Sequence, residues 1–215
     1  MTHPGGERTT RARILEVAEA FLGECGYHGT RLHLIAQRVG IQKASLFHYF
    51  PSKEGLYRAV IDEGFGETEE TIRRVIEASG TPFDKVRLLV ESYVDMVAAH
   101  PARTKILLRQ SLGDAPSGAP HTADSQRLLD VVVQFIRDGQ QAQTFEAIDP
   151  VALVLGIVGM VAFFFTSAPV LAPAWCDDPW NAMHVERVKH HVVQVVERCL
   201  TPTERPHAAA RRATA

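Results

Sequence analysis

The 215-residue chain is 46% hydrophobic and 22% charged, which is the composition of a globular protein with a substantial core. Its three cysteines (Cys25, Cys176 and Cys199) lack any C-x-x-C spacing, so the sequence argues against a disulfide framework or a thiolate zinc site and favours a reduced, cytoplasmic setting. Residues 1–60 carry eight Lys and Arg against five Glu, whereas the rest of the chain is net acidic, so we expect an anionic partner at the N-terminal end only.

Helical periodicity begins close to the N-terminus. Gly26 and Gly40 each follow an apolar stripe and are suited to end a helix, because glycine adopts the left-handed conformation easily. Thr30 and Ser52 each precede such a stripe and are expected to act as N-caps. The sequence therefore predicts helices over 9–25, 31–39, 43–49 and 53–64, the last of them extending further if its glycines are tolerated.

Helical patterns continue to residue 200, and strand signals are nearly absent, so we predict an all-α protein. The expected helices cover 83–99, 102–112, 124–142, 149–172 and 180–200, with a loop over 113–120. The predicted organisation is a disordered N-terminal arm (1–8), a three-helix helix-turn-helix domain (9–52) connected through helix 53–64, a larger C-terminal helical bundle for ligand binding and dimerisation (65–200), and a disordered tail (201–215).

The stretch from Thr30 to Tyr57 consists of two short predicted helices joined by a tight turn at Val39–Gly40–Ile41. Ile41 is expected to fill the corner between the helices, and Leu46 and Phe50 to bury the second helix. Two helices that cross through a short glycine-containing turn form a helix-turn-helix. The second helix of this motif enters the DNA major groove.

Side chains left outside the predicted core are suited to DNA. Gln42 can read adenine and Lys43 guanine, while small or apolar side chains can meet a thymine methyl. Lys53 and Thr30 are each expected near a helix N-terminus, where the helix dipole favours a phosphate. The predicted DNA-binding residues are Thr30, Gln42, Lys43, Ala44, Ser45, Phe47, His48, Tyr49 and Lys53.

The same stretch resembles the TetR family of bacterial transcriptional regulators. The family pattern is matched without gaps by Thr30, Ile35–Ala36, Val39–Gly40–Ile41, Leu46–Phe47–His48–Tyr49–Phe50, Lys53 and Leu56. This resemblance implies a homodimer that binds a palindromic double-stranded DNA operator, usually represses transcription, and leaves DNA when a small-molecule effector enters the C-terminal domain. No cofactor is expected.

The resemblance also places the dimer interface in the last two helices of each protomer. Valines recur at a 3–4 spacing along 180–200, and the uncharged helix before it is too apolar to face water. The interface is therefore expected to include Val158, Phe164, Val185, Val188, Val192 and Val195.

An effector pocket is expected among helices 83–99, 102–112 and 149–172. The lack of charge over 150–176 favours a mainly hydrophobic or aromatic effector. Candidate pocket residues are Leu89, Tyr93, Met96, Arg109 and Phe163, although side chains of this kind at helical spacing can equally be ordinary core.

Three other functions fit the sequence less well. The uncharged run over 150–176 approaches the length of a membrane span, but two prolines and two hydroxyl residues interrupt it, so no membrane association is expected. His184, His190 and His191, with Cys176 and Asp177 upstream, lack the i, i+4 spacing of a helical zinc site, and no metal is predicted. The chain also lacks G-x-S-x-G, a glycine-rich phosphate loop and H-E-x-x-H, so it is not expected to be an enzyme.

Overall fold

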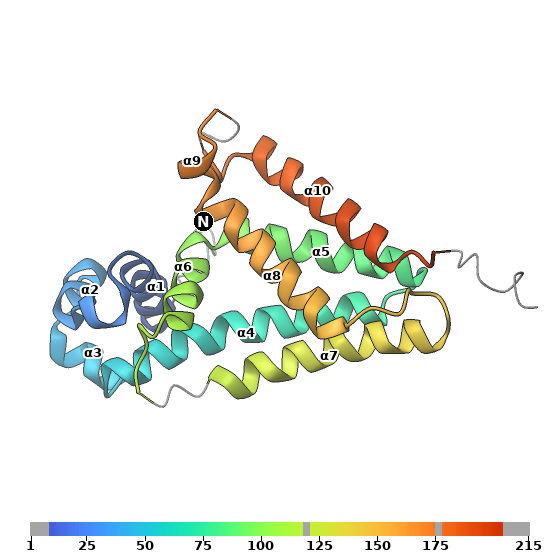
Figure 1. The fold of residues 1–215 in the computed structure, drawn as a ribbon. Helices are drawn as coiled ribbons and strands as arrows, with labels where there is room; N and C mark the ends of the chain where they lie inside the picture. The colour runs from blue at the N-terminus through green and yellow to red at the C-terminus, as the bar shows by residue number, and fades with distance from the viewer. Residues whose placement is uncertain (1–8, 118–120, 175–177, 204–215) are drawn as a thin grey trace, which may run out of the picture.

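The computed structural model describes residues 9–117, 121–174 and 178–203, and within these ranges all regular structure is helical (Figure 1). The all-α prediction is confirmed. The helices are α1 (Thr10–Gly29), α2 (Leu32–Val39), α3 (Lys43–Tyr49), α4 (Lys53–Glu77), α5 (Pro82–Ala99), α6 (Pro101–Ser111), α7 (His121–Gln141), α8 (Pro150–Thr166), α9 (Ala168–Leu171) and α10 (Ala182–Leu200).

The N-terminal helices share one apolar core. α1, α2, α3 and the first half of α4 contribute most of its side chains, including Ile14, Ile35, Leu46 and Val60. Ile106 of α6 completes it, so a helix that follows α5 in the chain packs into the N-terminal unit. The contact between α1 and α6 is therefore part of the fold of both units.

α4 is longer than predicted and joins the two units (Figure 1). It continues through Gly64 to Glu77. The missing side chain at Gly64 makes room for Arg103 of α6, since a Cβ there would lie 2.7 Å from Arg103 Cδ. The Thr68 hydroxyl also donates to the Gly64 carbonyl at 2.8 Å. The predicted boundary between residues 64 and 65 thus falls inside a continuous helix.

The C-terminal helices surround a second core, to which α5, α7, α8 and α10 contribute. α10 lies along α5 and contacts α8 (Figure 1). The predicted single helix over 149–172 is wrong, because α8 ends at Thr166 and a short α9 follows. Pro169 explains the break: it has no N–H with which to continue α8, but a proline fits the first turn of a new helix. Among the described residues, no helix is long and apolar enough to cross a membrane.

The predicted disordered arm and tail lie at the two ends of the chain. Residues 1–8 and 204–215 lie outside the described residues. Residues 201–203 are held in place, since the backbone N–H and the hydroxyl of Thr203 both donate to the Glu146 carboxylate at 2.8 Å. The prediction that disorder begins at residue 201 is therefore wrong.

Candidate functional site

The turn between α2 and α3 is fixed by backbone geometry and by one long-range contact. Gly40 is left-handed, with φ 81° and ψ 32°, as predicted for the residue that ends α2. The N–H groups of Gly40 and Ile41 both donate to the Ala36 carbonyl at 3.0 Å. Arg13 of α1 donates to the Val39 carbonyl at 3.0 Å, which satisfies another acceptor at this helix end.

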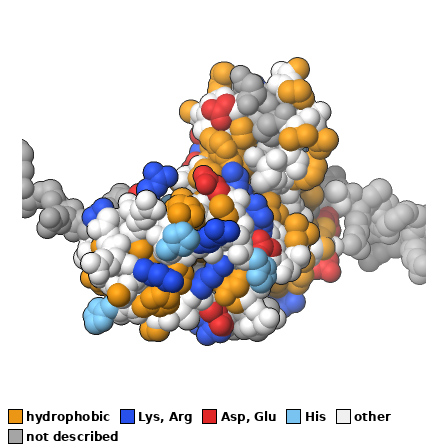
Figure 2. All heavy atoms as spheres, turned by 90° about the vertical axis from the view of Figure 1, so that its left-hand side faces the viewer, with side chains coloured by type: hydrophobic (Ala, Val, Ile, Leu, Met, Phe, Trp, Pro, Cys, Tyr) orange, Lys and Arg blue, Asp and Glu red, His pale blue; other side chains and the backbone are white. Residues whose placement is uncertain are grey.

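α3 presents most of its side chains to solvent. Leu46 and Phe50 are buried in the N-terminal core, as predicted. The seven remaining candidate positions on this helix are all exposed: Gln42, Lys43, Ala44, Ser45, Phe47, His48 and Tyr49. Figure 2 shows Lys, Arg and His side chains gathered on this end of the molecule. The sequence therefore predicted both the turn and the exposed face of the second helix.

Thr30 does not have the role predicted for it. The N-cap of α2 is Arg31, and Thr30 is the C-cap of α1. Its side chain is only 3% exposed, and its hydroxyl donates to the Gly26 carbonyl at 2.6 Å. α1 is kinked at Gly26, which has φ 71°, and Thr30 lies inward after this kink. Thr30 is therefore not a candidate DNA contact.

Lys53 lies at the start of α4, and Ser52 caps that helix as predicted by accepting from the Gly55 N–H at 2.9 Å. The Lys53 ammonium donates to the His28 carbonyl at 3.3 Å and lies 4.7 Å from the Tyr27 ring centre. Partial burial lowers the pKa of Lys53, and the negative charge of Asp114 opposes this shift. Lys53 thus fastens α4 to the end of α1, and its predicted phosphate contact stays a prediction.

Two arginines near α3 were not singled out from the sequence. Arg31 and Arg38, at the two ends of α2, are both exposed. The only sequence signal for them was the basic excess of residues 1–60, because no motif spacing distinguishes a phosphate-binding arginine from a solvated one.

α6 is joined to the N-terminal unit by a charged bridge that the sequence did not predict. The Arg103 guanidinium donates to Glu67 of α4 at 2.8 Å and to Glu19 of α1 at 3.1 Å, while its side chain is nearly buried. The two carboxylates raise the pKa of Arg103 against the opposing effect of burial. Near this bridge, α1 and α6 approach so closely that a Cβ on Gly23 would lie 2.8 Å from Ala102 Cα.

A second contact joins the C-terminal end of α6 to α1. The Asp114 carboxylate accepts from the His28 N–H at 3.3 Å and lies 3.6 Å from the Arg109 guanidinium. Arg109 also donates to the Glu24 carbonyl at 3.1 Å. A displacement of α6 would therefore act on α1 at two points along its length.

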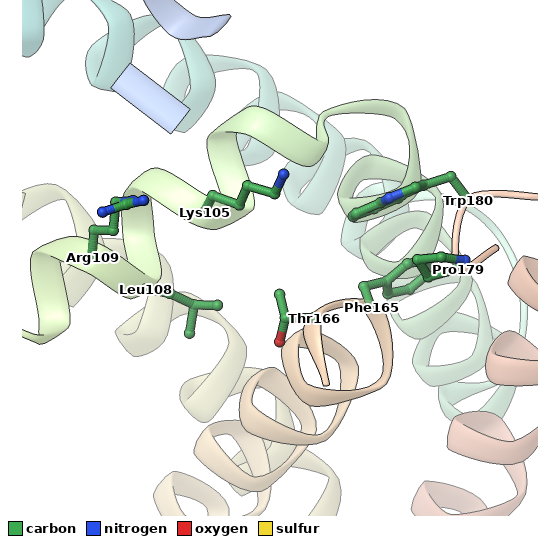
Figure 3. A pocket seen from close by; sticks show the side chains of 7 residues that line it. All are labelled: Lys105, Leu108, Arg109, Phe165, Thr166, Pro179 and Trp180. Atoms are coloured by element: carbon green, nitrogen blue, oxygen red, sulfur yellow. The ribbon is translucent and has the colours of Figure 1, made fainter. Parts of the chain in front are cut away.

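Of the five predicted pocket residues, only Arg109 lines the cavity that the structure shows. This cavity has a volume of about 400 Å³ and lies between α6, the end of α8 and residues 179–180 (Figure 3). Leu89, Tyr93, Met96 and Phe163 do not line it. Tyr93 is partly buried, and desolvation raises its pKa to about 12. The Met96 sulfur lies 2.9 Å from the Thr68 hydroxyl, and Phe163 is 57% exposed.

The predicted dimer residues divide into two groups. Val185, Val188 and Val192 are buried in the core of their own protomer, so assigning them to a dimer interface was wrong. Phe164 and Val195 are half-buried, and Val158 is exposed on α8. The described residues contain no group of three or more side chains suited to hold a metal ion; Cys176 and Asp177 lie outside them.

Two models of known protein families match this chain and together assign it to a family. The family model described as bacterial regulatory proteins, tetR family, matches residues 14–60, which include α2, α3 and the turn between them. The model described as tetracyclin repressor-like, C-terminal domain, matches residues 82–196. The chain belongs to the TetR family. It is a DNA-binding transcriptional regulator of the helix-turn-helix type.

Individual known proteins are similar to this chain in sequence or in fold. The HTH-type transcriptional regulator RutR of Escherichia coli K12 is 25% identical over 186 residues, covering 84% of this chain and 87% of RutR. AibR, solved in complex with isovaleryl coenzyme A and operator DNA, has a TM-score of 0.71 at 21% identity and covers 91% of this chain and 100% of its own. The ketosteroid transcriptional regulator KstR2 of Mycobacterium tuberculosis has a TM-score of 0.72 at 19% identity, covering 93% and 98% of the two chains.

Proposed function

We propose that this TetR-family regulator is a repressor that binds a palindromic operator as a homodimer in the cytoplasm and leaves it when a small molecule binds the C-terminal domain. The observation that carries the proposal is the exposed face of α3, which stands on a turn fixed by Gly40 and by the contact from Arg13. The side chains on this face are suited to base edges and not to catalysis, so we propose no enzymatic role.

DNA binding divides between reading and positioning. Gln42 and Lys43, at the N-terminal end of α3, are proposed to contact base edges in the major groove. Arg31, Arg38 and Lys53 are proposed to contact phosphates, which fix the orientation of the protein without reading sequence.

Release of the operator requires a path from the effector to α3. α6 supplies one, because its residues Lys105, Leu108 and Arg109 line the cavity while Arg103 and Ala102 are packed against α1 and α4. An effector that favours a displaced α6 would therefore shift the population toward an arrangement of α1 to α3 that no longer fits the operator.

The outer face of α8 is the proposed centre of the dimer. Leu155 and Phe163 are both 57% exposed there, and both belong to a helix without charged residues. Gly156 and Gly159 lie on the same face with open space beside them, so a second helix can approach closely. α10 borders this face with exposed polar side chains, which suit the rim of an interface.

We expect Lys43→Ala and Lys53→Ala to affect DNA binding in different ways. Loss of Lys43 should relax specificity at one base pair in each half-site, at roughly 1–3 kcal/mol. Loss of Lys53 should weaken operator and random DNA equally and lower the salt slope by about 0.9 for each phosphate that is no longer neutralised. Fluorescence anisotropy at several salt concentrations measures both effects. Equal losses on operator and random DNA for Lys43→Ala would contradict the reading role of α3.

Leu155→Glu is expected to give a folded monomer, because a dimer through α8 would bury this carboxylate without a partner in each protomer. Sedimentation at micromolar concentration should show the loss of the dimer, with helical circular dichroism unchanged. Leu112→Glu is the matched control, since Leu112 is exposed at the end of α6 and should leave the dimer intact. A dimeric Leu155→Glu protein would place the interface elsewhere.

A further inference from the structure

The cavity beside α6 joins a cationic wall to an aromatic wall (Figure 3). Lys105, Leu108 and Arg109 come from one face of α6, since residues three and four positions apart are neighbours on a helix. Phe165 and Thr166 at the end of α8, with Pro179 and Trp180, form the opposite side. In this view, the Lys105 side chain extends along α6 toward Trp180.

The positive charge of Lys105 is not neutralised by the described part of the chain. Lys105 is exposed and forms no ion pair with the described residues, and no carboxylate belongs to the described lining. Arg109, in contrast, points its guanidinium toward α1, where the Glu24 carbonyl and Asp114 accept it. Asp178, beside the cavity in sequence, turns its carboxylate to the Trp180 N–H at 2.9 Å. Among the described lining residues, Lys105 is thus the cation that has no ion-pair partner.

The aromatic wall is firmly supported from behind. The rings of Phe165 and Trp180 are stacked, with centroids 5.0 Å apart and an interplanar angle of 23°. Phe165 is buried, and the His184 ring packs edge-on against it at 5.8 Å. Burial lowers the pKa of His184, and the nearby charge of Arg187 lowers it further, while the Phe164 carbonyl and Asp178 oppose the shift. These effects together favour the neutral form of the His184 ring behind the wall.

We propose that this cavity binds a small organic anion with a flat apolar body, whose carboxylate or equivalent group pairs with Lys105 while its body lies against Phe165, Trp180 and Leu108. A volume of about 400 Å³ is enough for a ligand of this size. The inference rests on the proposed function only in taking this cavity as the effector site. It adds an anionic group to the mainly hydrophobic or aromatic effector expected from the sequence, because Lys105 places a positive charge on the α6 wall.

The test compares two probes that share a ring system and nearly the same shape but differ in charge. Sodium 2-naphthoate and neutral 2-naphthamide are titrated into the purified protein without DNA, by calorimetry and by the change in tryptophan fluorescence. Naphthoate should bind roughly 10- to 100-fold more tightly than naphthamide, as expected for a hydrogen bond to a charged group. Absence of naphthoate binding, or equal binding of both probes, would overturn the proposal.

Three variants separate the contributions of charge and shape. Lys105→Met should reduce naphthoate binding to the level of naphthamide and leave naphthamide binding unchanged. Leu108→Trp should fill the cavity and abolish binding of both probes, whereas Arg137→Met removes the same charge from an exposed position on α7 and should change neither. Undiminished naphthoate binding by Lys105→Met or by Leu108→Trp would show that the probe binds elsewhere.

Because these titrations contain no DNA, they test the proposed ligand class independently of the proposed repressor function. A protein that binds operator but shows no preference for naphthoate would overturn the ligand class alone. A protein that prefers naphthoate through Lys105 but fails to bind any operator would overturn the proposed function and leave the ligand class standing.

Discussion

Val192→Glu is expected to unfold the C-terminal helices, with a loss of several kcal/mol in the free energy of unfolding. Val192 is fully buried in the core that α5, α8 and α10 share, so its replacement would place an unpaired carboxylate in an apolar interior. Urea unfolding followed by circular dichroism measures the change. The loss should be present at every protein concentration, because it arises inside one protomer.

Gln194→Glu is the matched control for this variant. It introduces the same side chain two residues later, at an exposed position of α10. The control should unfold with the same midpoint as the parent protein. A Val192→Glu protein that stayed folded and merely became monomeric would show that the valine face of α10 lies at a dimer interface instead.

Arg103→Met is expected to lower the free energy of unfolding by about 3 kcal/mol, since it leaves the partly buried Glu19 without its cation. The guanidinium links α6 to both α1 and α4, so the N-terminal unit should also become easier to unfold on its own. Hydrogen exchange of α1 amides, together with urea unfolding, measures both effects.

The double variant Arg103→Met with Glu19→Gln tests whether the unpaired charge of Glu19 causes the loss of stability. Neutralising Glu19 removes the unpaired charge, so the double variant should be more stable than Arg103→Met alone, although still without the bridge. Equal stability of the single and double variants would mean that packing of the Arg103 stem, and not its charge, accounts for the loss.

The parts that the sequence predicted well are those determined by neighbouring residues. Gly40 ends α2, Ser52 caps α4, and Leu46 and Phe50 are buried with exposed positions between them. Each of these features depends on residues that are close to it in the sequence. Local spacing of this kind reports directly on helix ends and on which face is buried. The exposed face of α3 could therefore be predicted from the sequence alone.

The parts that the sequence did not predict depend on distant partners. The valine stripe of α10 indicated burial correctly, but periodicity does not say whether the partner is α5 of the same chain or a second protomer. Thr30 was misassigned because its hydroxyl is turned inward, to the Gly26 carbonyl at the kink in α1. Arg103 lies 36 positions from Glu67 and 84 positions from Glu19 in the sequence, and no local pattern reveals such a pairing.

Selection of DNA duplexes from a random pool by the purified protein, followed by sequencing, tests the central claim most directly. A homodimer that reads the major groove through α3 should enrich a two-fold palindrome whose half-sites are centred about one helical turn apart, roughly 34–36 Å. The Lys43→Ala protein should enrich the same palindrome with one position relaxed in each half-site. Enrichment of no sequence, or of a motif without two-fold symmetry, would contradict a dimeric, sequence-specific regulator that reads DNA through this helix.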